Sequence, residues 1–368
     1  DLGKVTVSAA EGVTSARLNQ NVIALNRTEY FLALDPSDKG IEARMKRLEE
    51  DRQLFTERVA QLRSTAGEQR NKLLDDVEAS YADYNTGLEA TFALAKQVGA
   101  SVQLGQAQQS LLDAVMASRP KADALQKTVR AYSDFVNKQG DEISAQAAAD
   151  AAFAQTLIAW QQSHGRHDLP WQGTRDAYRI WLSEIMLQQT QVDTVIPYYG
   201  RFLARFPDLP SLAAAPVEDV LTLWSGLGYY ARARNLHKCA QAVMTRHGGT
   251  FPVDPAMLAE LPGIGRSTAA AISAFAHGTR AAILDGNVKR VLTRCFGIDG
   301  FPGSKNVENA LWTLAESLLP ASDVDIYTQA QMDLGATVCT RGKPACGRCP
   351  LAARCVALAE ERIAELPT

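Results

Sequence analysis

Four cysteines near the C-terminus have the spacing of a metal site. Cys339, Cys346, Cys349 and Cys355 lie within seventeen residues, in the pattern C-x6-C-x2-C-x5-C, and all six cysteines of the chain follow residue 238. Such bunching argues against a secreted disulfide framework and favours a metal site in a reducing compartment. Four thiolates suit either a tetrahedral zinc ion or an iron–sulfur cluster, and spacing alone does not choose between them. The isolated Cys239 and Cys295 are predicted to be small buried apolar residues.

A short glycine-containing segment has the character of a phosphate-binding turn. Gly263 and Gly265 stand two apart in the segment 261–269 and allow a tight turn with close backbone approach. A helix is predicted to begin directly after them, where its free N–H groups and its dipole favour a bound phosphate. Because helical patterns lie on both sides, the segment is typical of a helix–hairpin–helix clamp on a DNA backbone.

An aspartate follows this turn at the start of another predicted helix. Asp285 stands eighteen residues beyond Ser267. Aspartate is favoured as a helix N-cap for its own sake, so a purely structural role is one interpretation. The alternative is a carboxylate held beside a sugar, and one residue can serve both purposes.

The elements that must position these residues fall into two unlike halves. Residues 1–150 carry 18 basic and 22 acidic side chains, a net charge of −4, whereas residues 151–368 carry 20 and 19, a net charge of +1. Neither half is strongly basic, so composition alone does not indicate a nucleic-acid partner. No apolar run reaches the length needed to span a bilayer, and Asp1 is expected to be a processed or cut end.

The first half has the pattern of a helical bundle. Narrow apolar seams at heptad spacing run along its segments and predict four antiparallel helices within residues 1–150. Ser37 and Ser118 are the predicted helix caps. The breaks between helices are predicted at 35–38, 64–67 and 118–120, with interruptions near Gly99 and Gly105.

This half loosely resembles the ligand-sensing helical bundle of bacterial chemoreceptors. The stretch 24–31 and the last helix, rich in alanine and glutamine, carry the resemblance. It implies a periplasmic sensor, with a structural bundle or spacer as the alternative. Such sensors normally lie between two membrane-spanning helices, which this sequence lacks, so a natural gene and an engineered fusion both stay open.

The second half matches a known superfamily in several long blocks. Residues 181–192 (WLSEIMLQQTQV) and 223–235 (LWSGLGYYARARN) look like two of its signature segments, and the hairpin, the segment 283–291 (ILDGNVKRV) and the four cysteines follow in order. From about Phe153 to the C-terminus, the chain resembles the adenine DNA glycosylases of the helix–hairpin–helix superfamily with an iron–sulfur cluster.

The resemblance implies an all-α fold, a cofactor and a partner. A four-helix bundle over 1–150 precedes a two-lobed glycosylase domain over 151–368. One lobe, of six helices, spans roughly 170–280, and the other combines 151–169 with 281–368 and holds a 4Fe-4S cluster on the four cysteines. The implied partner is double-stranded DNA containing adenine opposite guanine or 8-oxoguanine, in a cytoplasmic, nucleoid-associated setting. Protein partners stay open.

The resemblance also implies residue roles. Glu184 is the general acid that protonates the adenine ring, Asp285 stabilises positive charge on the sugar, and Asn287 helps to position acid and water. Gln189 and Tyr229 insert into the duplex where the adenine has swung out. The further residues expected to contact the base or the DNA are Arg166, His167, Trp171, Leu187, Thr190, Gly263, Gly265, Ser267 and Gln329. His167 stands where the family often has arginine or lysine.

Breaking a glycosidic bond through an oxocarbenium-like state sets a demand on the two carboxyl groups. One of them must be protonated at neutral pH, which requires a desolvated pocket that raises its pKa. Glu184 stands among Trp181, Leu182, Ile185 and Met186, so we predict apolar surroundings for it.

Ser267 discriminates between two reactions of the superfamily. Relatives that also cut the strand place a lysine nucleophile there, whereas serine cannot form an imine, so water must attack the sugar. The sequence therefore predicts a monofunctional enzyme. A strand-cutting pyrimidine glycosylase is one alternative, and a ligand sensor or scaffold with a non-catalytic glycosylase-like half is another. Adenine glycosylases usually carry a further domain that reads 8-oxoguanine, and we expect Thr368 to lie where its linker would begin.

Overall fold

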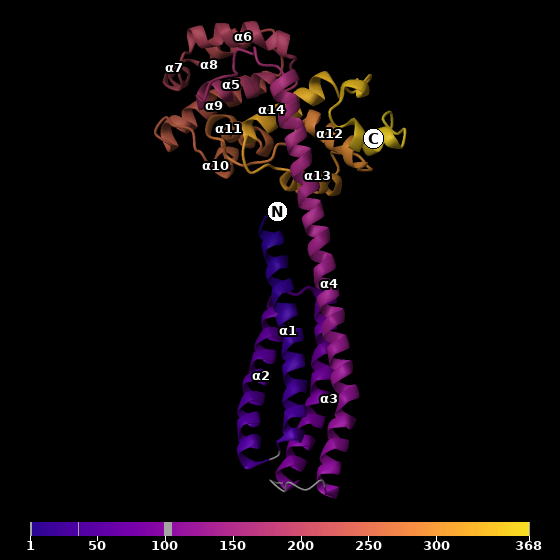
Figure 1. The fold of residues 1–368 in the computed structure, drawn as a ribbon. Coiled ribbons are helices and arrows are strands. Elements are labelled where there is room, and N and C mark those ends of the chain that lie inside the picture. Colours follow the sequence, from indigo (N-terminus) through magenta and orange to yellow (C-terminus); the bar gives the residue numbers. More distant parts are fainter. Residues whose placement is uncertain (1, 36, 99–104, 368) are drawn as a thin grey trace. The chain divides into compact units, whose positions relative to one another are not determined.

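The computed structural model describes residues 2–35, 37–98 and 105–367 of the chain, and these residues form helices joined by turns, with no strand among them (Figure 1). The predicted all-α fold is therefore confirmed. The chain divides into two compact units, Asp1–Ala147 and Ala148–Thr368. None of the helices in the described part combines the length and the apolar character that crossing a membrane requires.

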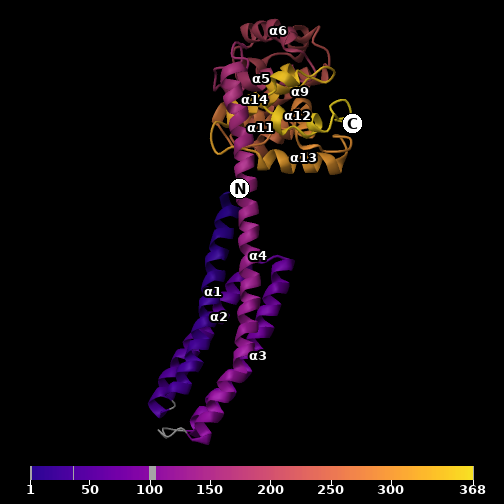
Figure 2. The ribbon, with the colours of Figure 1, turned by 45° about the vertical axis from the view of Figure 1, so that its right-hand side comes forward.

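The first unit is a bundle whose helices run side by side (Figures 1 and 2). Ser37 caps the second helix, since its Oγ accepts a hydrogen bond from the Gly40 N–H at 3.1 Å. Apolar side chains from all four helices, among them Leu25, Phe55, Leu88 and Tyr132, form one buried core. The helices are α1 (Leu2–Leu34), α2 (Asp38–Thr65), α3 (Glu68–Val98) and the first part of α4 (Gln106–His164).

The predicted break at 118–120 is wrong, because α4 continues through Pro120. Proline cannot donate to the carbonyl four residues earlier, but Met116 is exposed, so water can replace the missing hydrogen bond on that side. Ser118 is not a cap, since its Oγ donates to the Val115 carbonyl and to Glu29. The chain passes from α3 to α4 between Val98 and Gln106; Gly105 directly precedes α4, and Gly99 lies outside the described residues.

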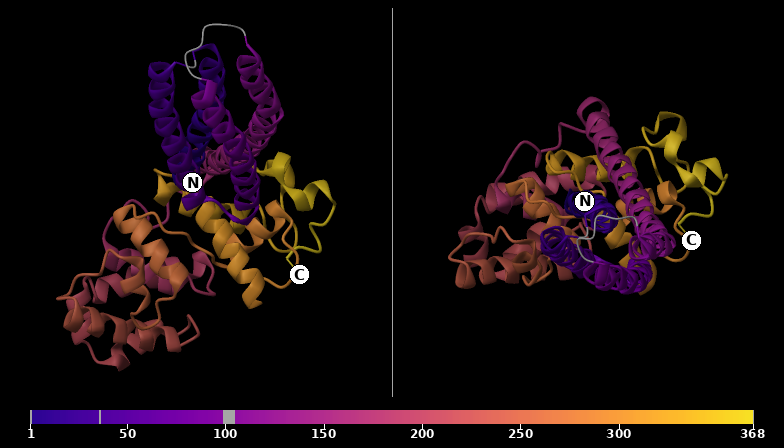
Figure 3. Two further views of the ribbon diagram at one scale, coloured as in Figure 1. Left: turned by 90° about the horizontal axis from the view of Figure 1, so that it is seen from below. Right: turned by 60° about the horizontal axis from the view of Figure 1, so that its bottom comes forward.

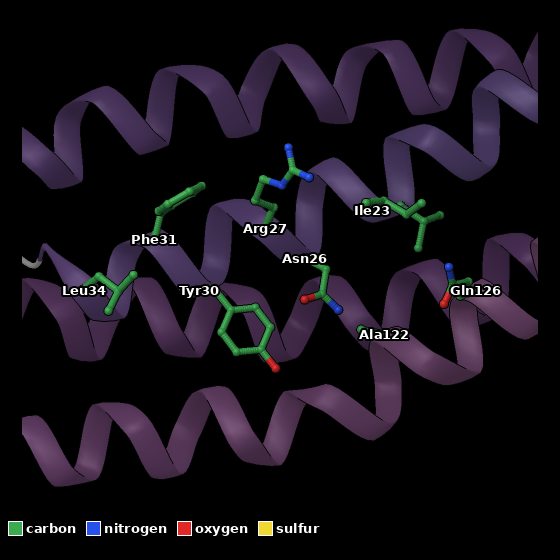
Figure 4. A pocket seen from close by; sticks show the side chains of 9 residues that line it. Ile23, Asn26, Arg27, Tyr30, Phe31, Leu34, Ala122 and Gln126 are labelled. Atoms are coloured by element: carbon green, nitrogen blue, oxygen red, sulfur yellow. The ribbon is translucent and has the colours of Figure 1, made fainter.

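The bundle also carries a shallow groove of about 400 Å³ between α1 and α4. Asn26 and Tyr30 project from α1 toward the part of α4 that contributes Ala122 and Gln126 (Figure 4). The lining offers one cation, Arg27, and no carboxylate.

The second unit has two cores that share one helix. The first core surrounds Trp181 and Trp224, and the second surrounds Phe153 and Tyr327. In α11 (Arg266–His277), Ala269 belongs to the first core, and Ala270 and Ala271 belong to the second, so this alanine-rich helix packs on both sides. The helices of the first core gather on one side of the unit and those of the second on the other (Figure 3). After the end of α4, the helices are α5 (Ala177–Leu187), α6 (Val192–Arg205), α7 (Leu209–Ala214), α8 (Val217–Trp224), α9 (Ala231–Arg246), α10 (Pro255–Ala259), α11 (Arg266–His277), α12 (Gly286–Phe296), α13 (Lys305–Ser317), α14 (Val324–Thr337) and α15 (Val356–Ala359), with two short 3-10 turns at Cys346–Arg348 and Ala352–Arg354.

Candidate active site

A pocket of about 470 Å³ lies in the second unit, between residues of both cores. The end of α4, the middle of α5 and the first turns of α14 contribute to its wall, together with Phe275 of α11 and the loop 165–176. Five of the residues singled out in the sequence line it: Arg166, His167, Trp171, Glu184 and Gln329.

Glu184 projects from a helix in which most of the other residues are buried. Asp176 caps α5 by accepting a hydrogen bond from the Tyr178 N–H at 2.9 Å, and the residues on both sides of Glu184 are buried. Burial, and then the charge of Asp285, raise the pKa of Glu184 to about 8. A carboxylic acid with this pKa carries its proton at neutral pH and can donate it to a base in the pocket.

Asp285 is the N-cap of α12, and its charge also affects the pKa of Glu184. Its carboxylate accepts hydrogen bonds from the Val288 N–H at 2.8 Å and from Asn287 Nδ2 at 3.4 Å. Burial raises the pKa of Asp285, while these hydrogen bonds oppose the rise by favouring the ionised form. Neither Asp285 nor Asn287 lines the pocket itself, yet the charge of Asp285 acts on Glu184. The pair therefore combines a protonated carboxylic acid, Glu184, with a carboxylate, Asp285.

The glycine turn has the geometry expected of a helix–hairpin–helix. Gly263 has a φ of 80°, and a Cβ there would lie 2.8 Å from the Asn235 Cβ, so both backbone conformation and space require glycine. Gly265 is the N-cap of α11, with no side chain to occupy the free N–H groups of its first turn. In that turn the Ser267 Oγ accepts a hydrogen bond from the Leu284 N–H at 3.0 Å. Ser267 thus fixes the segment that leads into Asp285.

Two exposed residues have left-handed backbone conformations, which residues other than glycine rarely adopt. Gln189 has a φ of 57° and Tyr229 a φ of 50°, and the Tyr229 side chain is 63% exposed. They lie outside the pocket, as do the partly buried Leu187 and Thr190. The Thr190 Oγ1 accepts a hydrogen bond from Arg232 at 2.9 Å.

Sequence reasoning missed Asp333, which does not line the pocket but binds two residues that do. This carboxylate is 1% exposed and accepts hydrogen bonds from the Arg166 N–H at 2.9 Å and Nε at 2.8 Å, from Gln161 Nε2 at 3.0 Å and from Gln329 Nε2 at 2.8 Å. It therefore fixes two predicted pocket residues at once. The only local signal was its position four residues after Gln329, on the same face of α14.

The four cysteines line one small apolar cavity, together with Val338, Pro344 and Leu358. All four are free thiols, and within the described residues no three side chains of the His, Cys, Asp or Glu type are placed to hold a single metal ion. The chemistry of four thiols on one apolar cavity fits an iron–sulfur cluster, and it fits a zinc ion as well. The buried Cys295, which the sequence presented as isolated, contacts Cys355 through its thiol.

Residues 182–317 match the family model described as HhH-GPD superfamily base excision DNA repair protein. The matched segment contains Glu184, Asp285 and the whole hairpin. The chain carries an HhH-GPD domain. Within the matched residues, the turn at Gly263–Ser267 leads into α11, which packs on both cores.

Curated proteins that match this chain include adenine DNA glycosylases. An adenine DNA glycosylase from Buchnera aphidicola subsp. Acyrthosiphon pisum (strain APS) is 45% identical over 215 residues, which cover 58% of this chain and 61% of the relative. An adenine DNA glycosylase from Mus musculus is 41% identical over 259 residues, covering 68% and 48%. The chain thus spans about half to three fifths of the length of these relatives.

Solved structures resemble about three fifths of this chain in fold. A thermostable thymine-DNA glycosylase is 29% identical with a TM-score of 0.54, over 59% of this chain and 99% of that one. A trapped covalent intermediate of endonuclease III with DNA is 21% identical with a TM-score of 0.50, over 58% and 98%.

Proposed function

We propose that the second unit is a monofunctional DNA glycosylase that removes adenine mispaired with guanine or 8-oxoguanine. The observation that carries the proposal is the Glu184 carboxyl at the wall of a pocket of about 470 Å³, where burial and the charge of Asp285 raise its pKa. The names of the curated relatives favour adenine as the base.

In the proposed reaction, Glu184 and Asp285 act at opposite ends of the breaking bond. Glu184 donates its proton to a ring nitrogen of the adenine, so the base leaves with the electron pair of the C1′–N9 bond. The ionised Asp285 stabilises the positive charge that develops on the sugar, and Asn287 holds that carboxylate by its amide. Water then adds to C1′ and gives up a proton, leaving an abasic site.

The pocket supplies the contacts for a base taken out of the duplex. Extrusion of a base costs a few kcal/mol and costs least for a mispaired one. Arg166 and Gln329 present polar groups whose positions Asp333 fixes, and the rigid wall lowers the entropy cost of binding. Trp171 adds an aromatic surface that is held edge-on against Tyr199.

The DNA backbone is proposed to bind at the hairpin and at the cysteine loop. The free N–H groups that begin α11 suit one phosphate, and the basic residues Arg341, Lys343 and Arg348 lie between or beside the cysteine ligands. We propose that Cys339, Cys346, Cys349 and Cys355 hold a 4Fe-4S cluster. When bound, such a cluster supplies four iron–thiolate bonds that cross-link the loop.

A single-turnover assay tests the proposed activity. Duplexes with one adenine opposite guanine, 8-oxoguanine, cytosine or thymine are compared with a duplex that carries thymine opposite guanine. Release of adenine from the first two duplexes, with breakage only after hot alkali, is the expected result. Release of thymine instead, or breakage without alkali, would reject the assignment.

A further inference from the structure

We propose that Arg232 is a positioning residue that holds Gln189 and Tyr229, the two side chains assigned to duplex insertion, in their inserting geometry before DNA binds. The inference rests on the proposed function, but its test measures DNA binding and not excision, so that the inference and the proposed function can fail separately.

One guanidinium joins the two segments that carry these side chains. The Arg232 Nη1 donates to the carbonyls of the last turn of α5 and of the residue after it, and Nη2 donates to the loop that precedes Tyr229. The planar fork of arginine can serve both directions at once, which a lysine ammonium cannot. The acceptors are the carbonyls of Ile185 (3.0 Å), Met186 (2.9 Å) and Gln188, the Oγ1 of Thr190 (2.9 Å), and the carbonyls of Leu227 (3.3 Å) and Gly228 (3.4 Å).

These contacts involve the residues directly next to Gln189 and Tyr229. Gln188 and Thr190, on either side of Gln189, are each bonded to Arg232. Gly228 directly precedes Tyr229, whose own carbonyl accepts a hydrogen bond from the Arg232 N–H at 2.9 Å. The guanidinium carbon also lies 5.5 Å from the centre of the Tyr229 ring.

Both bracketed residues need an external restraint. Among the described residues, four that are not glycine have a left-handed φ, and two of these are Gln189 and Tyr229. Such conformations carry an energetic cost and persist only where the surroundings fix them. Both side chains are exposed, so packing does not hold them. The hydrogen bonds of Arg232 supply the restraint, and a pre-set geometry avoids an ordering cost when DNA binds.

The test uses duplexes with a stable abasic-site analogue opposite guanine, together with undamaged duplexes. The abasic site has no base to excise, so insertion into the gap is measured without catalysis. The quantity compared is the ratio of Kd for the undamaged duplex to Kd for the abasic duplex, at fixed salt. Arg232→Lys is the main variant, since lysine keeps a cation at the C-terminal end of α5 but cannot span to the second loop. Arg246→Gln, at an exposed position of the same helix, is the control.

We expect Arg232→Lys to lower this ratio about tenfold, through weaker binding of the abasic duplex. Binding of the undamaged duplex should stay within about twofold, because phosphate contacts dominate it. Arg246→Gln should leave the ratio unchanged. In a Tyr229→Ala background, Arg232→Lys should cost less than in the wild type, because one of the two side chains that it positions is gone.

Three results would overturn the inference: an unchanged ratio, an equal loss on both duplexes, or the same loss in the Tyr229→Ala background. Thr190→Val gives a second, milder test that leaves Arg232 in place. It removes one acceptor beside Gln189 and should lower the ratio by about threefold. A Thr190→Val protein with the wild-type ratio would contradict the bridging role even if Arg232→Lys did not fold.

Discussion

The charge of Asp285 adds to burial in raising the pKa of Glu184 to about 8, so the two carboxyl groups have different protonation states at neutral pH. Asp285 is stabilised as an anion by hydrogen bonds from the Val288 N–H and the Asn287 amide. No hydrogen bond to Glu184 is found among the described residues that would favour its ionised form in the same way. One site therefore holds the proton that a leaving base needs and the negative charge that a cationic sugar needs.

The catalytic pair should respond to isosteric substitution. Glu184→Gln cannot donate a proton and should lower the single-turnover rate by about two to four orders of magnitude, while DNA binding is kept. Asp285→Asn keeps the helix cap but loses the charge, and should cost about two to three orders of magnitude. Excision rates and Kd values on the same duplex check both variants. Wild-type activity in either variant would show that the pair is misassigned.

Ser267 predicts the absence of a covalent adduct. The wild-type protein should form no borohydride-trapped complex through residue 267, because a hydroxyl cannot form an imine. Ser267→Lys should introduce weak trapping and strand cleavage. It should also lower the excision rate, because the Ser267 Oγ accepts a hydrogen bond from the N–H of Leu284, the residue directly before Asp285. A wild-type adduct mapped to Ser267 by mass spectrometry would contradict the monofunctional assignment.

Features that a few adjacent residues determine could be predicted from the sequence, whereas features that depend on distant contacts could not. Ser37, the hairpin glycines and Asp285 were readable because caps and turns are set by a few adjacent residues. The prediction at Pro120 was wrong, since a proline is tolerated in a helix where the residue four positions earlier, here Met116, is exposed to water. Asp333 and Arg232 were missed because their partners lie far along the chain, up to 172 residues away for Asp333. Periodicity does not report such contacts.

Gly335 should be required where α14 crosses α12. A Cβ at this position would lie 2.5 Å from the Asn287 Cβ and 3.0 Å from its Cα. Gly335→Ala should therefore destabilise the fold by about 1–3 kcal/mol and displace Asn287, which lowers excision as well. Gly200→Ala in α6 meets nothing within 4 Å and should be neutral or stabilising. Thermal unfolding and excision rates of the two variants are the comparison, and equal behaviour would reject the close-approach argument.

The cysteine loop should bind iron rather than zinc. Protein purified without oxygen should contain about four iron atoms per chain and absorb visible light, as thiolate-bound clusters do. Cys346→Ala should lower the iron content, whereas Cys239→Ala, at a buried cysteine of the other core, should leave it unchanged. Stoichiometric zinc without iron would overturn the cluster assignment.

The pH dependence of adenine excision tests the central claim, that Glu184 acts as a protonated acid, most directly. Single-turnover rates are measured on a duplex with adenine opposite guanine, at constant ionic strength, for the wild type and for Glu184→Gln. The wild-type rate should fall as the pH rises through about 8, because Glu184 then loses the proton that it must donate. On the acid side it should fall where Asp285 becomes protonated, above the usual aspartate pKa, because burial raises the pKa of Asp285. The residual activity of Glu184→Gln should lack the alkaline fall. A wild-type rate that stays level or rises from pH 7 to 9, or an alkaline fall that survives in Glu184→Gln, would contradict the account.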